Sequence, residues 1–140
     1  GMDSLCHSTT LLYKGKTIGV LSSGIDIVHP SQNLDLSRKV TDLGLLITDK
    51  SIGTRPSKHS YLSSEQLVTQ ISAASIFIEG KENGIESSII YNAIKQNKPI
   101  FAIPGNIFSD TSRGPNLLIT QGNAQPIMHF NEVINYIEKT

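Results

Sequence analysis

The segment that decides the fold is IFAIPGNIFSDTSRGPNLLITQG, residues 100–122. It begins as an apolar run, breaks at Pro104-Gly105-Asn106, continues as a polar loop with a single Arg113, and ends in a short apolar stretch. A proline at the first helical position costs no hydrogen bond, so Gly114-Pro115-Asn116 predicts a helix start. The segment is expected to form a strand, a loop and a helix over 117–121. Backbone N–H groups and one guanidinium then point to a common place, which suits an anion.

Strand and helix patterns alternate along the rest of the chain. Short apolar runs rich in β-branched residues predict strands, and amphipathic segments predict helices. The strands are expected at 17–22, 45–48, 75–79, 99–103 and 126–128, and the helices at 32–43, 64–74, 86–96, 117–121 and 132–139. Such alternation implies right-handed crossovers and a parallel sheet covered on both faces. The sequence therefore predicts one α/β domain over residues 1–140, with a doubly wound, mainly parallel sheet.

Charge and composition narrow the class of protein. The 140 residues carry 12 basic and 12 acidic side chains, for a net charge of zero, whereas a nucleic-acid binder usually has a basic surplus. Cys6 is the only cysteine, which excludes an internal disulfide and agrees with a reducing compartment. The sequence has no apolar run near the roughly 18 residues of a membrane span and no signal-peptide pattern, so we expect a cytoplasmic protein without membrane contact.

Three polar loops that contain glycine follow predicted strands, at 22–26, 79–84 and 104–106. Ligands of doubly wound sheets bind beyond the carboxyl ends of the strands. Each loop alone is equally well explained by a glycine that ends a strand. Together, and with Ser87 and Ser88 at the start of a helix, they favour a crevice for a phosphate or a sugar-phosphate backbone. Asp26 either orients a ligand hydroxyl or caps an Asx-type turn, and Asn106 extends the third loop.

Signatures of catalysis are missing from the sequence. It contains no G-x-G-x-x-G, no G-x-x-x-x-G-K-[ST] and no G-x-S-x-G. The four histidines are scattered and lack the spacing of metal ligands. We therefore expect a protein that is not an enzyme and that holds no metal and no cofactor.

Several segments resemble, in order, the Rossmann-like domain of the DNA-processing protein A (DprA/Smf) family. The resemblance rests on TIGVLSSGIDIVHPSQNLDL (17–36), GLLITD (44–49), SIFIEGKENGIESSIIYNAI (75–94) and, most specifically, KPIFAIPGNIFSDTSRGPNLLITQGNAQPI (98–127). At the start, MDSLCHSTTLLYKGK resembles the segment after that family's first glycine-rich motif, with Asp3 and His7 in matching positions. An earlier strand–helix–strand part of the family domain has no counterpart here, so the domain is expected to be truncated at its N-terminus relative to the family.

The resemblance implies that the chain binds single-stranded DNA, hands it to a recombinase during DNA uptake in competence and natural transformation, and forms a homodimer. It implies phosphate-binding roles for Ser23, Gly24, Gly105 and Arg113, and weaker ones for Lys14 and Lys16. A basic patch around Arg113 that includes Arg55 and Lys58 would support this reading.

One departure from the family weakens the expected DNA binding. Where the family has an Arg-rich stretch, this chain has YLSSEQ at 61–66, with hydroxyls and a carboxylate instead of guanidinium groups. Because phosphate neutralisation dominates affinity for nucleic acids, the sequence predicts weak binding.

Two other functions stay open on the sequence. The chain could be a domain that binds a nucleotide or nucleoside phosphate with a phosphoribohydrolase-like fold, although the Pro-Gly-Gly-x-Gly-Thr turn of those enzymes is missing. It could also have a structural role, in which an exposed sheet edge is covered by a second copy.

Overall fold

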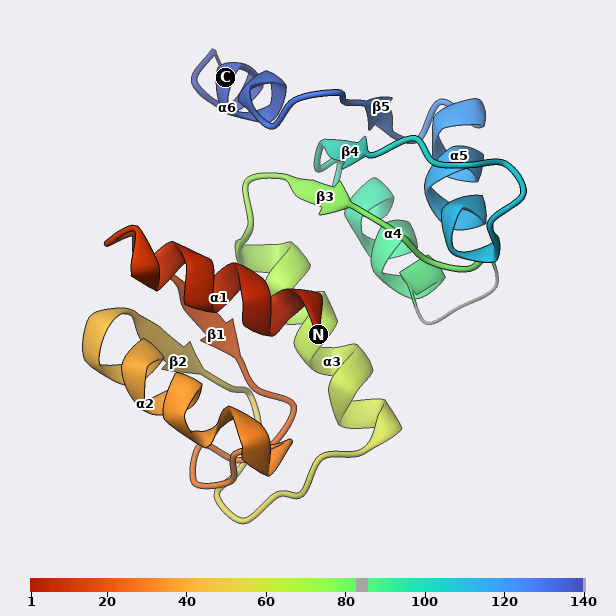
Figure 1. The fold of residues 1–140 in the computed structure, drawn as a ribbon. Coiled ribbons are helices and arrows are strands. Elements are labelled where there is room, and N and C mark those ends of the chain that lie inside the picture. The colour runs from red at the N-terminus through yellow and green to blue at the C-terminus, as the bar shows by residue number, and fades with distance from the viewer. Residues whose placement is uncertain (83–85, 140) are drawn as a thin grey trace. The chain divides into compact units, whose positions relative to one another are not determined.

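The computed structural model describes residues 1–82 and 86–139, and at 86–89 the backbone alone. The chain folds into two compact units, Gly1–Leu67 (unit 1) and Val68–Thr140 (unit 2) (Figure 1). The expectation of one domain over 1–140 stays a prediction. Within the described residues, no helix is both long and apolar enough to cross a lipid bilayer.

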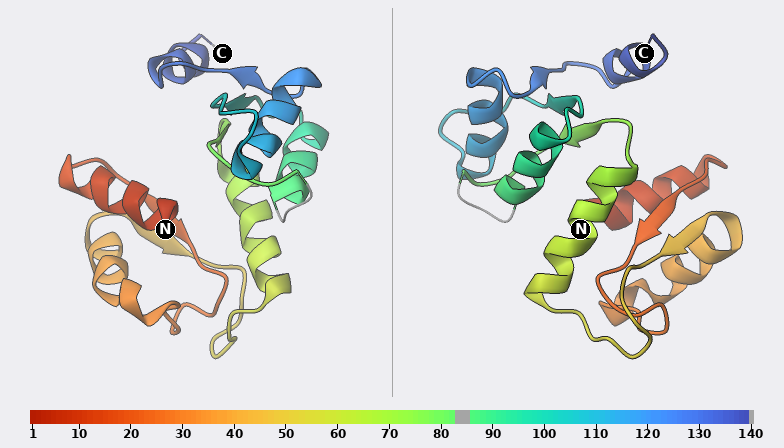
Figure 2. Two further views of the ribbon diagram at one scale, coloured as in Figure 1. Left: turned by 45° about the vertical axis from the view of Figure 1, so that its right-hand side comes forward. Right: turned by 180° about the vertical axis from the view of Figure 1, so that it is seen from behind.

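Unit 1 is built on a short parallel sheet of two strands. Its elements are α1 (Met2–Leu12), β1 (Ile18–Val20), η1 (Ser31–Asn33), α2 (Leu34–Leu43), β2 (Leu45–Ile47) and most of α3 (Lys58–Ile71). The helices α1 and α2 lie on the same face of this sheet (Figure 2). Gly19 pairs with Leu46 on the face toward α2, and the missing side chain of Gly19 leaves room for Leu46 and Val40.

The two strands of unit 1 are less buried than the sequence predicts. Ile18 and Leu45 pair on the other face of the sheet, and they are 50% and 51% exposed. Side chains alternate between the faces of a strand, so one face packs against helices while these two residues stay half open. The predicted parallel pairing of these strands is confirmed, and only their burial is lower than expected.

Unit 2 contains three parallel strands in the order β3-β4-β5. Its elements after the end of α3 are β3 (Ser75–Phe77), α4 (Glu86–Lys95), β4 (Ile100–Ala102), η2 (Asp110–Ser112), α5 (Arg113–Thr120), β5 (Gln125–Pro126) and α6 (Asn131–Ile137). Helices join successive strands, so β3–α4–β4 and β4–α5–β5 are two consecutive βαβ units.

The central strand β4 carries the core of unit 2. Ile100 and Ala102 pack with residues of α4 and α5, including Ala93 and Leu118. Phe101, on the opposite face, packs with Ile127 and with Val133 of α6, and its ring meets that of Tyr136 edge to face at 5.4 Å. All three residues of β4 are buried. The doubly wound arrangement is thus confirmed in unit 2, where helices cover both faces of β4.

Two helices begin earlier than the sequence predicts. The sequence predicts a helix from residue 64, whereas the Ser63 hydroxyl is not a cap and donates to Asp49 (2.7 Å). The helix begins at Lys58, because the Ser57 and Ser60 hydroxyls each accept the backbone N–H of the other residue, at 3.1 and 2.8 Å. Likewise α5 begins at Arg113, as a continuation of the 3-10 turn η2, rather than at residue 117.

Candidate functional site

The loops after β3 and β4 meet at one edge of unit 2. Parallel strands end at the same edge of a sheet, and both loops contact the start of α5 there. The Gly80 N–H donates to the carbonyl of Thr111 (2.6 Å), and the Gly114 N–H donates to the carbonyl of Gly80 (2.9 Å). We call Gly80, the loop 104–112 and Arg113–Asn116 the carboxyl rim of unit 2. The predicted convergence of these two glycine loops is confirmed.

Glycine is required at two positions of this rim by close approach of neighbouring groups. A Cβ atom at Gly114 would lie 2.7 Å from the Gly80 carbonyl oxygen, and one at Gly105 would collide with the Ser112 side chain. Gly105 is also held by Asn116, whose Oδ1 accepts its N–H (3.0 Å) and whose Nδ2 donates to its carbonyl (3.0 Å). The Gly105 amide is therefore occupied within the protein. Sequence reasoning did not select Asn116, although it is the first polar residue after the Gly-Pro pair.

Asn106 shapes the loop of the rim. Its Oδ1 accepts the N–H of Phe108 (2.9 Å), which is the hydrogen bond of an Asx-turn. The Ser109 N–H donates to the Asn106 carbonyl (3.0 Å). Asn106 is exposed at the edge where a ligand would arrive.

Arg113 is the cation of the carboxyl rim. It is the first residue of α5, its side chain is 61% exposed, and its Nε lies 3.4 Å from Oδ1 of Asp110. A surface pair of this kind contributes about 0–1 kcal/mol. A phosphate can therefore compete with Asp110 for this guanidinium.

In unit 1, Ser23, Gly24 and Asp26 join the loop after β1 to the loop after β2. The Ser23 hydroxyl is buried and donates to the carbonyl of Ile27 (2.6 Å). Both carboxylate oxygens of Asp26 accept the Gly53 N–H, at 2.9 and 3.1 Å. Asp26 thus bridges two loops rather than capping its own turn, and its role toward a ligand stays a prediction.

The contacts of Gly24 place it between the same two loops. Its N–H donates to the carbonyl of Thr54 (2.9 Å), and a Cβ atom there would lie 2.6 Å from the Ser51 carbonyl oxygen. The Ser23 hydroxyl and the Gly24 amide are both occupied by such contacts. Their proposed phosphate-binding roles therefore stay predictions.

The predicted lysines lie in different parts of unit 1. Lys16 is exposed and precedes β1, so it lies toward the amino end of that strand, whereas Ser23 follows its carboxyl end. Unit 1 thus does not bring Lys16 and Ser23 to one edge. Lys58, the first residue of α3, and Arg55 are exposed. They belong to unit 1 and Arg113 to unit 2, so their common patch stays a prediction.

Part of the third predicted loop lies outside the described residues. This applies to Asn83 and Gly84, and to the side chains of Ser87 and Ser88. Within the described residues, no group of three or more His, Cys, Asp and Glu side chains is arranged to hold a metal ion.

A polar cluster that sequence reasoning missed engages Lys50. Its Nζ lies 2.9 Å from Oδ2 of Asp49 and 2.8 Å from the Ser63 hydroxyl, and its side chain is 15% exposed. The hydrogen bonds from Lys50 and then Ser63 lower the pKa of Asp49 below its usual value. Lys50 is therefore committed to a carboxylate near the start of α3.

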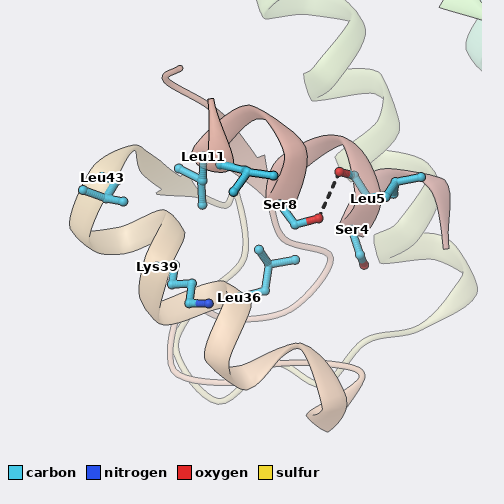
Figure 3. A pocket seen from close by; sticks show the side chains of 8 residues that line it. Ser4, Leu5, Ser8, Leu11, Leu36, Lys39 and Leu43 are labelled. Carbon is cyan, nitrogen blue, oxygen red and sulfur yellow. Dashed lines mark hydrogen bonds between the residues drawn. The ribbon is translucent and has the colours of Figure 1, made fainter. Parts of the chain in front are cut away.

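A groove of about 570 Å³ lies between α1 and α2 of unit 1 (Figure 3). It is lined by Ser4, Leu5, Ser8, Leu11, Leu12, Leu36, Lys39 and Leu43. The Ser8 hydroxyl donates to the carbonyl of Leu5 (3.0 Å) and is thus occupied within α1. Lys39 is the one charged residue of the lining. None of the residues predicted to bind phosphate lines this groove, and its apolar lining does not suit a polyanion.

Parallel βαβ units whose glycine loops meet beyond the strand ends define a Rossmann-like α/β binding domain. Residues 1–138 match the family model described as DNA recombination-mediator protein A. The chain belongs to this family, which confirms the resemblance found in the sequence.

Similar proteins and structures support this assignment. The DNA processing protein DprA of Bacillus subtilis is 30% identical over 122 residues, which are 87% of this chain and 41% of that protein. The structure of DprA from Streptococcus pneumoniae matches with a TM-score of 0.87 and 25% identity, over 96% of this chain and 47% of that one. The structure of DNA processing protein A from Helicobacter pylori, which concerns its single-stranded DNA binding mode, matches with a TM-score of 0.80 and 26% identity, over 88% of this chain and 56% of that one.

Coverage differs between this chain and its relatives. The chain spans 41% of the Bacillus subtilis protein, and it spans 35% of a protein from Mycobacterium tuberculosis that is 27% identical to it. What these longer proteins do as a whole therefore enters below as a proposal.

Proposed function

We propose that this chain is a single-stranded DNA-binding module that serves DNA uptake and recombination, and that it binds the strand weakly through the carboxyl rim of unit 2. The observation that carries the proposal is the placement of Arg113. Its exposed guanidinium lies at the edge where two glycine loops meet, and the exposed Asn106 lies in the second of these loops, after β4. Family membership and the single-stranded DNA binding studied in the Helicobacter pylori protein support this choice of ligand.

Weak affinity follows from the charges of the chain. The net charge is zero, and Arg113 is the only arginine of unit 2. Each phosphate that a protein neutralises on a single strand adds about 0.7 to the slope of log affinity against log salt. With few cations available we expect a shallow slope, of about 1 to 2 on this basis.

The proposal gives the chain binding without catalysis. Transfer of the strand to a recombinase, assembly into a homodimer and a cytoplasmic location are proposed with it, because they follow from the family resemblance. A nucleoside phosphate is the competing ligand, since a single phosphate would also suit Arg113. A competition experiment with nucleoside monophosphates and the DNA strand distinguishes the two ligands. If DNA is the ligand, the strand should bind more tightly than a monophosphate, because it makes several phosphate contacts and a monophosphate makes one.

The test is a fluorescence-anisotropy titration of a labelled oligothymidylate at several salt concentrations, with Arg113→Glu beside the wild type. The matched control is Arg38→Glu. Arg38 is 70% exposed and pairs with Asp35 three residues before it, as Arg113 pairs with Asp110, so both variants change the net charge equally. Arg113→Glu should weaken binding about fivefold, since it removes one charge-assisted contact of roughly 1 kcal/mol. Arg38→Glu should change binding less than twofold.

Two results would overturn the proposal. One is wild-type protein that shows no binding to the oligothymidylate even at low ionic strength. The other is equal loss of affinity in both variants, because binding would then follow net charge and not the carboxyl rim.

A further inference from the structure

Phe108 is the most exposed large apolar side chain among the described residues. Phe108 is 89% exposed, and its neighbour Ile107 is 73% exposed. The two residues are adjacent in a polar loop, and apolar groups that are exposed together and rimmed by polar residues can form a binding surface. The two residues lie in the loop of the carboxyl rim, between Gly105 and Arg113.

The loop that carries Phe108 is fixed at both ends. Asn116 accepts the Gly105 N–H and donates to the Gly105 carbonyl, and Gly105 packs against Ser112. Inside the loop, the Phe108 N–H donates to the Asn106 side chain (2.9 Å). The ring is therefore presented to solvent by a loop that these hydrogen bonds hold in place. A ligand that uses this ring would not have to order the loop first.

The aromatic ring and the guanidinium are close in sequence, because Phe108 lies in the loop 104–112 and Arg113 follows this loop directly as the first residue of α5. Arg113 is the fifth residue after Phe108, which limits the distance between their Cα atoms to about 18 Å even for a fully extended chain. Phosphates and bases alternate along a single strand. A strand whose phosphate pairs with Arg113 therefore has unstacked bases within reach of the same loop.

We infer that Phe108 is a stacking platform for a base of the bound single strand. This inference rests on the proposed function and names the part of the DNA that the carboxyl rim recognises beyond its phosphates. Aromatic side chains stack on any base, because every base has a π-face, so this contact tolerates all sequences. It also favours single strands over duplex, since bases inside a duplex already stack on one another. Ile107 has no π-face and contributes apolar contact only.

The test compares two strands of equal length, an oligothymidylate and an abasic strand with the same phosphates. Phe108→Ala should weaken binding of the oligothymidylate about five- to tenfold and leave binding of the abasic strand unchanged. Phe108→Trp should restore the affinity. The salt dependence of binding should be the same in both variants as in wild type, because no phosphate contact is lost.

Tyr13→Ala is the matched control. Tyr13 is 80% exposed, follows α1 and lies on none of the glycine loops, so its removal deletes an equally accessible aromatic ring. It should not change the affinity for either strand. Phe108 has few contacts to lose, and circular dichroism of each variant shows whether the fold is kept.

The outcomes separate this inference from the proposed function. Wild-type protein that binds both strands, with Phe108→Ala equal to wild type, overturns the stacking role alone. An equal loss of affinity for both strands in Phe108→Ala also overturns the stacking role, because the substitution would then act through the loop and not through a contact with the base. Wild-type protein that binds neither strand overturns the proposed function and the stacking role with it.

Discussion

Replacing Gly114 by alanine should destabilise unit 2 by closing the space between α5 and the loop after β3. The new Cβ would lie 2.7 Å from the Gly80 carbonyl oxygen and 3.2 Å from Cε1 of Phe77. Ordinary contacts of this kind are about 3.5 Å, so one segment must move by more than half an ångström. That movement would stretch the hydrogen bonds of 2.9 and 2.6 Å that join Gly80 to Gly114 and Thr111.

The expected size of the effect follows from these contacts. Overpacking costs about 1–3 kcal/mol, and one weakened hydrogen bond adds about 1 kcal/mol. Alanine is favoured over glycine inside a helix by at most about 1 kcal/mol, which offsets part of this cost. The free energy of unfolding should therefore fall by roughly 1–3 kcal/mol.

Urea denaturation followed by circular dichroism measures this change. Thr120→Ala is the control, because Thr120 is exposed at the other end of α5 and its replacement should stay within about 0.5 kcal/mol. Gly114→Ala should also weaken binding of single-stranded DNA, since the rim would lose its shape. A Gly114→Ala variant as stable as wild type would refute the close approach of α5 to the loop after β3.

Three further changes test other parts of the structure. The pKa of Asp49 is lowered by hydrogen bonds from Lys50 and Ser63, so its stabilisation is complete above about pH 4 and is lost as the pH falls through the folded-state pKa. Asp49→Asn should therefore lower the free energy of unfolding by less than about 1 kcal/mol at pH 7, because the carboxylate is 42% exposed. It should not change this free energy at pH 2. Urea titrations at both pH values measure the two effects. Lys14 has a φ of 58° after the end of α1. Lys14→Gly should therefore increase the free energy of unfolding by about 0.5 kcal/mol and raise the midpoint of thermal unfolding slightly. A clear decrease of this midpoint would contradict this conformation. Asn116→Asp keeps an acceptor but loses the amide donor to the Gly105 carbonyl, so it should cost about 1 kcal/mol in urea titrations and weaken DNA binding.

The sequence predicted the order of strands and helices because local patterns determine it. The apolar run at 99–103 predicted β4, and the fully buried β4 (Ile100–Ala102) has the position and core role expected of it. The start of α3 was missed because Ser60, not a glutamate, completes the reciprocal cap with Ser57. The start of α5 was missed because a 3-10 turn leads directly into it.

The candidate site was predictable where strand topology determines it and not where single hydrogen bonds do. Parallel strands place the loops around Gly80 and Gly105 at one edge, and unit 2 confirms this. The partner of Asp26 is the Gly53 N–H, 27 residues away, and no local pattern indicates such a bond. The exposure of Phe108 is equally invisible in the sequence, because an apolar residue beside a strand normally suggests burial.

The central claim is that single-stranded DNA binds at the carboxyl rim of unit 2, and an NMR titration of the backbone amides with an oligothymidylate tests it most directly. We expect shift changes concentrated at Gly80, at residues 105–112 and at Arg113, saturating together with the anisotropy signal. Changes confined to the groove between α1 and α2, or no changes at a strand concentration that saturates the anisotropy signal, would contradict it.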